Sequence, residues 1–257
     1  MDMEARWISE MGAIVSVPQH HLGGNKATDR LIKDAEFKEG QKILVLGCGS
    51  GRTVVKILQK YRCEVIGTDI NPQAIKNCQK NYETHRNKFI GNATFIVDDL
   101  FHSTLQPASF DCIFIESVLI MLSKNEALAK IRDLLKEGGT MAINEGLCYS
   151  ANPLIMGQIE ELFKNWGIFW QLPTYNEWKD LFANYFTILS DSGPRRYKLI
   201  NLGLEMVVKN PFKMLGTGCR ILFNKEIRQF FFQVNTLMKQ AHLKWGYCLW
   251  ICKLKLD

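Results

Sequence analysis

A buried strand that runs directly into a glycine-rich loop constrains the fold of this chain more than any other feature. Residues 42–58 read KILVLGCGSGRTVVKIL, in which four apolar residues precede glycines at positions 47, 49 and 51. A continuous apolar run is typical of a parallel strand covered on both faces, and glycines permit a tight turn and close approach of the backbone to a ligand. Residues 53–58 resemble the first turns of a helix. The order of strand, glycine loop and helix predicts the start of a nucleotide-binding unit.

The spacing of these glycines favours a ligand that contains ribose but no pyrophosphate. A dinucleotide fingerprint reads G-x-G-x-x-G, whereas this loop reads G-x-G-x-G and has Arg52 where the last glycine would stand. A second apolar strand, 64–68, ends in Asp69, and an acidic residue about 20 positions past the loop can accept hydrogen bonds from both ribose hydroxyls. A nicotinamide oxidoreductase is therefore disfavoured.

Strands that alternate with helices predict the organisation of the core. Strands are expected at 42–47, 64–68, 93–97, 111–115 and 139–145. This alternation predicts an α/β fold with a parallel, doubly wound sheet. A sixth strand is expected at 186–189 and a seventh at 247–252.

Two further helices are predicted from local signals. Thr174 and Glu177 have the spacing of a capping box, which predicts a helix over 175–184. Residues 225–242 repeat apolar side chains at helical spacing and predict an amphipathic helix. Phe232 lies off that apolar stripe, so it is expected to be exposed or to face a ligand or a membrane.

The motifs, taken in order, resemble those of class I S-adenosylmethionine-dependent methyltransferases. They read VLGCGSGR, VIGTDINPQAI, FIVDDL, FDCIFIESVL and LLKEGGTMAINE, and the likeness covers roughly residues 22–192. Within that superfamily the chain is most similar to the small-molecule branch (methyltransferase type 11) that includes quinone-type C-methyltransferases. The segment HLGGNKAT at 21–28 resembles one that precedes the first strand in many of those enzymes. The resemblance implies S-adenosylmethionine as methyl donor and a Rossmann-like, seven-stranded sheet, mostly parallel, with an antiparallel last strand.

The resemblance also implies that the chain is divided into four parts. They are a helical lead over the active site at 1–40, a donor-binding core at 41–192, a basic helical insertion that caps the acceptor at 193–245, and the last strand of the sheet at 246–257.

The same resemblance places the donor at the carboxyl ends of the first four strands. The expected contacts are Gly47, Cys48, Gly49, Gly51, Asp69, Ile70, Asp98, Asp99, Leu100 and Glu116. Asp69 is expected to hold the ribose, and Ile70 to lie against the adenine. An acid after the third strand accepts from the adenine amine in the family. The pair Asp99-Leu100 matches that role better than Asp98, and the alternative is that such an acid caps a turn.

The candidates for catalytic contacts are His21, Glu116 and Tyr149. Glu116 is expected to orient the amino group of the donor or the acceptor, or to be satisfied by the backbone. His21 and Tyr149 are candidates for a general base, although each also has a structural alternative and an anionic acceptor needs no base. Aromatic residues at 166, 169, 170 and 178 either line an acceptor pocket, contact the sulfonium by cation–π attraction, or pack the cap. Packing is the favoured interpretation.

Absent motifs narrow the acceptor to a small, apolar or amphipathic molecule. The chain contains neither N/D-P-P-Y/F, which marks methylation of a base amine, nor a Pro-Cys nucleophile, so nucleic acid is disfavoured as a partner. Residues 193–257 carry a net charge of +9, which leaves −3 for residues 1–192. Such a basic region either is solvated or contacts an anionic membrane surface, RNA or an acidic substrate. RNA or protein methylation and a non-catalytic donor-binding module are the alternatives.

The distribution of apolar residues and the spacing of the cysteines predict a cytoplasmic protein without a metal. The chain has no run of about 18 apolar residues and does not begin with the basic-then-apolar order of a signal peptide. Its eight cysteines show no C-x-x-C spacing, which favours reduced, buried thiols over disulfides or a zinc site. No feature of the sequence indicates an oligomeric state.

Overall fold

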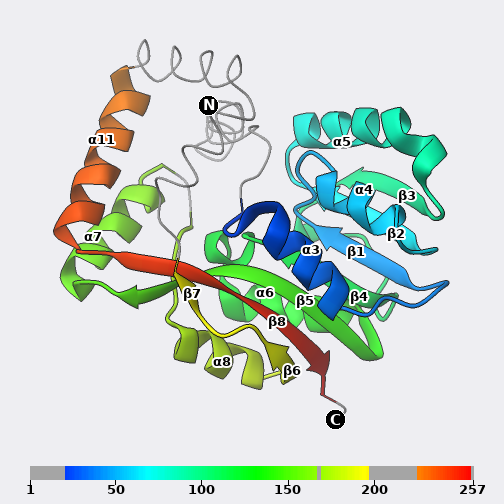
Figure 1. The fold of residues 1–257 in the computed structure, drawn as a ribbon. Coiled ribbons are helices and arrows are strands. Elements are labelled where there is room, and N and C mark those ends of the chain that lie inside the picture. Colours follow the sequence, from blue (N-terminus) through cyan, green and yellow to red (C-terminus); the bar gives the residue numbers. More distant parts are fainter. Residues whose placement is uncertain (1–20, 167–168, 197–224, 256–257) are drawn as a thin grey trace.

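The computed structural model describes residues 21–166, 169–196 and 225–255, and a mixed β-sheet runs through its centre (Figure 1). The strands are β1 (Lys42–Leu46), β2 (Glu64–Asp69), β3 (Asn92–Val97), β4 (Phe110–Glu116), β5 (Leu135–Ser150), β6 (Phe186–Asp191), β7 (Arg195–Arg196) and β8 (Lys244–Leu254). Their order is β3-β2-β1-β4-β5-β8-β6, with β7 paired to β8. The first five of these strands are parallel, and β8 is antiparallel to both β5 and β6.

The predicted α/β fold with an antiparallel last strand is confirmed, although the strands differ from the prediction in number and in extent. The sheet has an eighth strand, β7, that the sequence did not predict. Its two residues are too few to give a periodic signal. Strand β5 begins at Leu135 rather than at 139 and ends at Ser150 rather than at 145. Its pairing with β4 shifts register near Gly138, which has a φ of 70°. Gly138 and Gly139 therefore lie within an irregular strand.

Helices cover both faces of the sheet, as a doubly wound fold requires (Figure 1). One face carries α3 (Gly24–Asp34), α4 (Arg52–Leu58) and α5 (Pro72–His85); the other carries α6 (Lys124–Leu134) and α8 (Tyr175–Ala183). Short 3-10 helices are η2 (Arg86–Lys88), η3 (Leu100–His102) and η4 (Leu119–Met121). Side chains of a strand alternate between the two cores: Leu44 and Leu46 of β1 face α6, while Ile43 and Val45 face α3 and α4.

Helices α7 (Pro153–Lys164) and α11 (Lys225–Gln240) lie side by side at one end of the sheet (Figure 1). A third apolar cluster packs between these two helices. Phe230 and Val234 are buried in it, as the predicted helical stripe requires, whereas Phe232 is 70% exposed. Parts of the predicted lead and of the predicted basic insertion, 1–20 and 197–224, lie outside the described residues.

Two compositional expectations concern cysteines and membrane spans. The seven cysteines among the described residues are buried free thiols, as predicted. Within the described ranges, no helix is long and apolar enough to cross a bilayer.

Candidate functional site

Three glycines after β1 have left-handed backbone conformations. The φ angle is 66° at Gly47, 54° at Gly49 and 77° at Gly51. A Cβ on Gly47 would collide with Val118, and one on Gly51 would collide with Cys78, so both positions need glycine for packing within the protein. A Cβ on Gly49 would meet no atom within 4 Å. The middle glycine therefore borders open space, where a ligand can approach the backbone.

Asp69, at the end of β2, is hydrogen-bonded to this loop. Its Oδ2 accepts the backbone N–H of Gly49 at 2.9 Å, and its Oδ1 accepts that of Asn71 at 2.9 Å. Burial raises the pKa of Asp69, and the two N–H groups oppose this rise. Each carboxylate oxygen keeps a further lone pair. The structure thus brings the predicted ribose-binding acid against the glycine loop with acceptor capacity remaining.

The two acids that follow β3 have different surroundings. Asp99 caps η3: its Oδ1 accepts a backbone N–H of that turn at 3.1 Å, and its Oδ2 lies 2.7 Å from Nδ1 of His102. The side chain of Asp98 makes no hydrogen bond or ion pair with any residue that the structure describes. Leu100 is buried in the core, while Ile70 is 43% exposed after β2. Asp99 therefore caps a turn, which is the alternative that the sequence left open. The carboxylate of Asp98 has no partner among the described residues.

Glu116, at the end of β4, is held by hydroxyl groups from two helices. Its Oε1 accepts from Thr28 of α3 at 2.9 Å, and its Oε2 accepts from Thr53 of α4 at 2.7 Å. Nδ1 of His21 lies 3.6 Å from Oε1. This polar cluster lies at the carboxyl edge of the sheet, beside the point between β1 and β4 where the strand order reverses. Ligands of open α/β sheets bind at this point.

The hydrogen bonds of His21 assign the proton on its ring. Nδ2 of Asn144 donates to the carbonyl of Leu22 at 3.0 Å and lies 3.3 Å from Nδ1 of His21, which therefore accepts. The proton is then on Nε2, which donates to the hydroxyl of Thr28 at 3.2 Å. The only basic nitrogen of the ring is then Nδ1, which accepts from Asn144, so His21 becomes a base only when this hydrogen bond is released.

Tyr149 lies outside this cluster. Its ring is 5.7 Å from the guanidinium carbon of Arg196 in β7 and lies beside Gly246 of β8. Burial raises the pKa of Tyr149, and the positive charge of Arg196 opposes the rise. Among the described residues, no hydrogen bond joins Tyr149 to His21 or Glu116. The structure brings together two of the three predicted catalytic candidates.

The aromatic residues proposed for the acceptor pocket mostly pack within the protein. Trp178 is fully buried and donates Nε1 to a backbone carbonyl of β5 at 2.8 Å. Trp166 and Trp170 pack in the cluster between α7 and α11. Phe169 is 44% exposed and is the aromatic residue of this set with most free surface.

Sequence reasoning missed three members of the polar cluster: Thr28, Thr53 and Asn144. Thr28 belongs to the segment HLGGNKAT, and Asn144 is a polar residue within an apolar strand pattern. Both signals indicate a buried polar group that needs a partner. Their partners come from distant elements, so the sequence alone does not identify the contacts.

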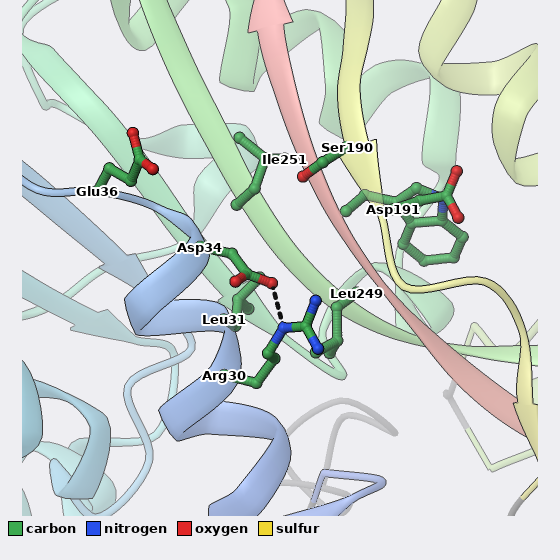
Figure 2. Close-up of a pocket in the computed structure, with 9 residues that line it drawn as sticks. Arg30, Leu31, Asp34, Glu36, Ser190, Asp191, Leu249 and Ile251 are labelled. Atoms are coloured by element: carbon green, nitrogen blue, oxygen red, sulfur yellow. Dashed lines mark hydrogen bonds and ion pairs between the residues drawn. The ribbon is translucent and has the colours of Figure 1, made fainter.

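A cavity of about 200 Å³ lies away from this cluster, between the C-terminal half of α3 and strands β6 and β8 (Figure 2). Arg30 and Asp34 form an ion pair of 2.7 Å on its α3 side, and Asp191 lies on the opposite side. None of the predicted site residues lines this cavity.

Comparison with known proteins identifies related sequences over the core. Residues 37–188 match the family model described as "Methyltransferase domain". O-methyltransferase rstn1 of Aspergillus nomiae is 29% identical over 145 residues, which are 54% of this chain and 64% of that protein. The matched part spans less than two thirds of the length of the first curated relatives.

Solved structures share the fold, and two of them illustrate the likeness. The phosphoethanolamine N-methyltransferase 2 of Haemonchus contortus, in complex with S-adenosyl-L-methionine, has a TM-score of 0.70 and 15% identity, covering 100% of this chain and 60% of that chain. The [4+2]-cyclase SpnF has a TM-score of 0.74 and 15% identity, covering 98% of this chain and 96% of that chain. At these identities the likeness concerns the fold alone, and one fold can host different reactions.

Proposed function

Because this chain belongs to the methyltransferase-domain family, we propose that it transfers a methyl group from S-adenosylmethionine to a small, apolar or amphipathic acceptor by in-line displacement. The family is S-adenosylmethionine-dependent, as the motifs predicted. That donor supplies an electrophilic methyl group on a sulfonium. The protein's contribution is then mainly positioning and the exclusion of water.

The observation that carries this proposal is the hydrogen bond of 2.9 Å between Gly49 N–H and Asp69 Oδ2. It fixes an acidic side chain beside a glycine that borders open space. Asp69 accepts the ribose hydroxyls with its remaining lone pairs, while Gly47, Cys48 and Gly51 keep the loop in the conformation that exposes Gly49. These residues fit a nucleoside ligand.

The adenine is held after β2 and β3. Ile70 and Leu100 border it, and its exocyclic amine donates to Asp98. Asp98 is favoured over Asp99 because Asp99 is engaged by η3 and by His102.

Glu116 binds the amino group of the donor. Its two oxygens are held by Thr28 and Thr53, so the carboxylate keeps one orientation at the strand end. His21 positions this cluster and, with Tyr149, stays a candidate for a general base. An acceptor that is already anionic requires neither.

The acceptor lies on the side of the cap, which consists of the lead at 1–40 and the insertion at 193–245. The ring of Phe169, which is 44% exposed in the segment before α8, supports an apolar or amphipathic acceptor. The relative from Aspergillus nomiae is named an O-methyltransferase and the neighbour from Haemonchus contortus an N-methyltransferase, so the accepting atom is left open. Cytoplasmic location and contact of the basic insertion with an anionic membrane stay predictions.

A methyl-transfer assay with tritium-labelled S-adenosylmethionine tests this proposal. The protein is incubated with separate pools of small phenols, small amines, isoprenoid quinols, total RNA and denatured protein. Label is expected in a small-molecule pool. Label only in RNA or protein would support the alternative acceptors, and donor binding without transfer to any pool would support a non-catalytic module.

A further inference from the structure

The loop 117–122, which joins β4 to α6, has an unusual backbone at its first residue. Ser117 has a φ of 57°, in the left-handed region that residues other than glycine rarely adopt. Its N–H donates to the carbonyl of Asn144 in β5 at 2.8 Å. Such a conformation persists only where the surroundings fix it. The contacts of the loop show what fixes it.

The loop contacts the glycine loop on one side and a segment of the cap on the other. Val118 occupies the space that a Cβ on Gly47 would need. The carbonyl of Ile120 accepts the backbone N–H of Gln171 at 2.9 Å, and this residue belongs to the segment 169–174 before α8. A displacement of the loop 117–122 would therefore reach both the glycine loop and this segment.

A buried carboxylate holds the amide groups of the loop. Glu145 of β5 is fully buried, and its Oε1 accepts the N–H groups of Val118 and Leu119, each at 2.7 Å. Its Oε2 accepts no hydrogen bond among the described residues. One oxygen atom of Glu145 thus holds two consecutive amides in place.

A buried ammonium group holds the carbonyl groups of the same loop. Lys124 is 6% exposed, and its Nζ donates to the carbonyls of Leu122 at 3.3 Å and Ile120 at 3.5 Å. The same Nζ lies 4.8 Å from the ring centre of Phe169, in the segment before α8. Lys124 and Glu145 also interact electrostatically, so a buried ionisable group holds the carbonyl groups of the loop and another holds its amide groups.

We propose that Glu145 and Lys124 are positioning residues that clamp the loop 117–122 and thereby couple the donor loop to the segment 169–174. The proposal rests on the proposed role of Gly47, Gly49 and Gly51 in donor binding. It assigns neither residue to the chemical step. A purely structural buried pair would stabilise the protein without affecting donor affinity, and this difference makes the proposal testable.

Two substitutions that both remove the charge separate the clamp from general stability. Glu145→Gln keeps an oxygen that can accept from Val118 and Leu119, whereas Glu145→Met fills a similar volume without an acceptor. Hydrogen–deuterium exchange over 117–122 and calorimetry with S-adenosylmethionine are measured for both variants. We expect the Met variant to exchange faster in this segment and to bind the donor about tenfold more weakly than the Gln variant.

Equal exchange and equal donor affinity in the two variants would overturn the clamp. Faster exchange with unchanged donor affinity would overturn the coupling to the glycine loop. If the Met variant does not fold, Glu145→Asp replaces it under the same criteria, because its shorter side chain does not reach both amides.

Lys124→Met tests the other half of the clamp by the same two measurements, with Lys130→Met in the same helix as the control. We expect faster exchange of 119–122 only in the Lys124 variant, and equal exchange in both variants would contradict its role. If the wild-type protein binds no S-adenosylmethionine, the donor-site proposal fails, while the exchange measurements still decide whether Glu145 and Lys124 hold the loop.

Discussion

Glu145 and Lys124 are ionisable groups whose burial makes their charged forms unfavourable. Burial raises the pKa of Glu145 to about 7, against the opposing effects of the amides of Leu119 and Val118 and the charge of Lys124. Burial lowers the pKa of Lys124 to about 8, against the opposing charges of Glu145 and Glu160. The free energy of unfolding should therefore fall as pH rises below neutrality, where Glu145 titrates. It should rise as pH rises above neutrality, where Lys124 titrates.

The pH dependence on the acidic side is a specific prediction. Between its ordinary pKa of 4.5 and about 7, Glu145 binds a proton in the folded protein that it has lost in the unfolded chain. The free energy of unfolding should then fall as pH rises through this window, by on the order of 3 kcal/mol from this group. Urea unfolding at several pH values measures the fall, which should be shallower in Glu145→Gln. Parallel curves for the two proteins would contradict the assignment.

At the scale of single residues, the sequence indicates which groups are unusual but not what they contact. The position of Asp69 at a strand end and its distance from the glycine loop were sufficient to place it beside that loop. The partners of Glu116 were not predictable, because Thr28 lies 88 positions away and Thr53 lies 63 away. Such contacts depend on how α3 and α4 dock on the sheet.

At the scale of elements, the glycine loop combines two kinds of glycine. Gly47 and Gly51 make room for side chains of the protein itself, whereas Gly49 leaves room that the protein does not fill. Only the second kind leaves space that a ligand can enter. Gly40, which has a φ of 80° and no atom near its potential Cβ, shares the backbone conformation of Gly49 but lies away from the site.

Gly49→Ala and Gly40→Ala form a matched test of this distinction. Both substitutions place a Cβ in a left-handed conformation and should lower the free energy of unfolding by about 1 kcal/mol. Only Gly49→Ala should weaken S-adenosylmethionine binding, by about tenfold or more, because its methyl group enters the ligand space. Urea unfolding and calorimetry measure the two effects. Equal donor affinity in both variants would argue against the loop as the donor site.

Elements with strong local signals were predictable, and short or irregular ones were not. The capping box of Thr174 and Glu177 is present, and α8 begins at Tyr175 as predicted. The extension of β5 was missed because Gly138 and Gly139 interrupt the apolar pattern without ending the pairing. The two-residue strand β7 leaves no pattern to detect.

At the scale of the whole molecule, the core and the cap differ in how well the sequence specifies them. The ordered motifs predicted the family and the α/β fold, and both are confirmed. The packing of α11 against α7 was not predictable, because an amphipathic stripe shows that a helix has a partner but not which one. The four-part division of the chain stays a prediction.

Phe230→Ala tests this packing, with Phe232→Ala of the same helix as the control. Phe230 is 2% exposed and contacts Phe163 of α7, whereas Phe232 is 70% exposed. We expect faster hydrogen exchange of α7 and α11 only in the Phe230 variant, with the central strands still protected. If both variants exchange alike, α11 does not depend on this cluster.

Asp69 and the glycine loop form the proposed donor site, and calorimetry with S-adenosylmethionine measures its affinity for the donor. Asp69→Ala is compared with the wild-type protein and with Asp34→Ala, which removes an acid of the separate cavity. We expect donor binding by the wild type and by Asp34→Ala, and affinity at least about tenfold lower for Asp69→Ala, since the ribose hydroxyls lose their acceptor. Unchanged affinity in Asp69→Ala, or wild-type binding of NAD in place of S-adenosylmethionine, would contradict this assignment of the donor site.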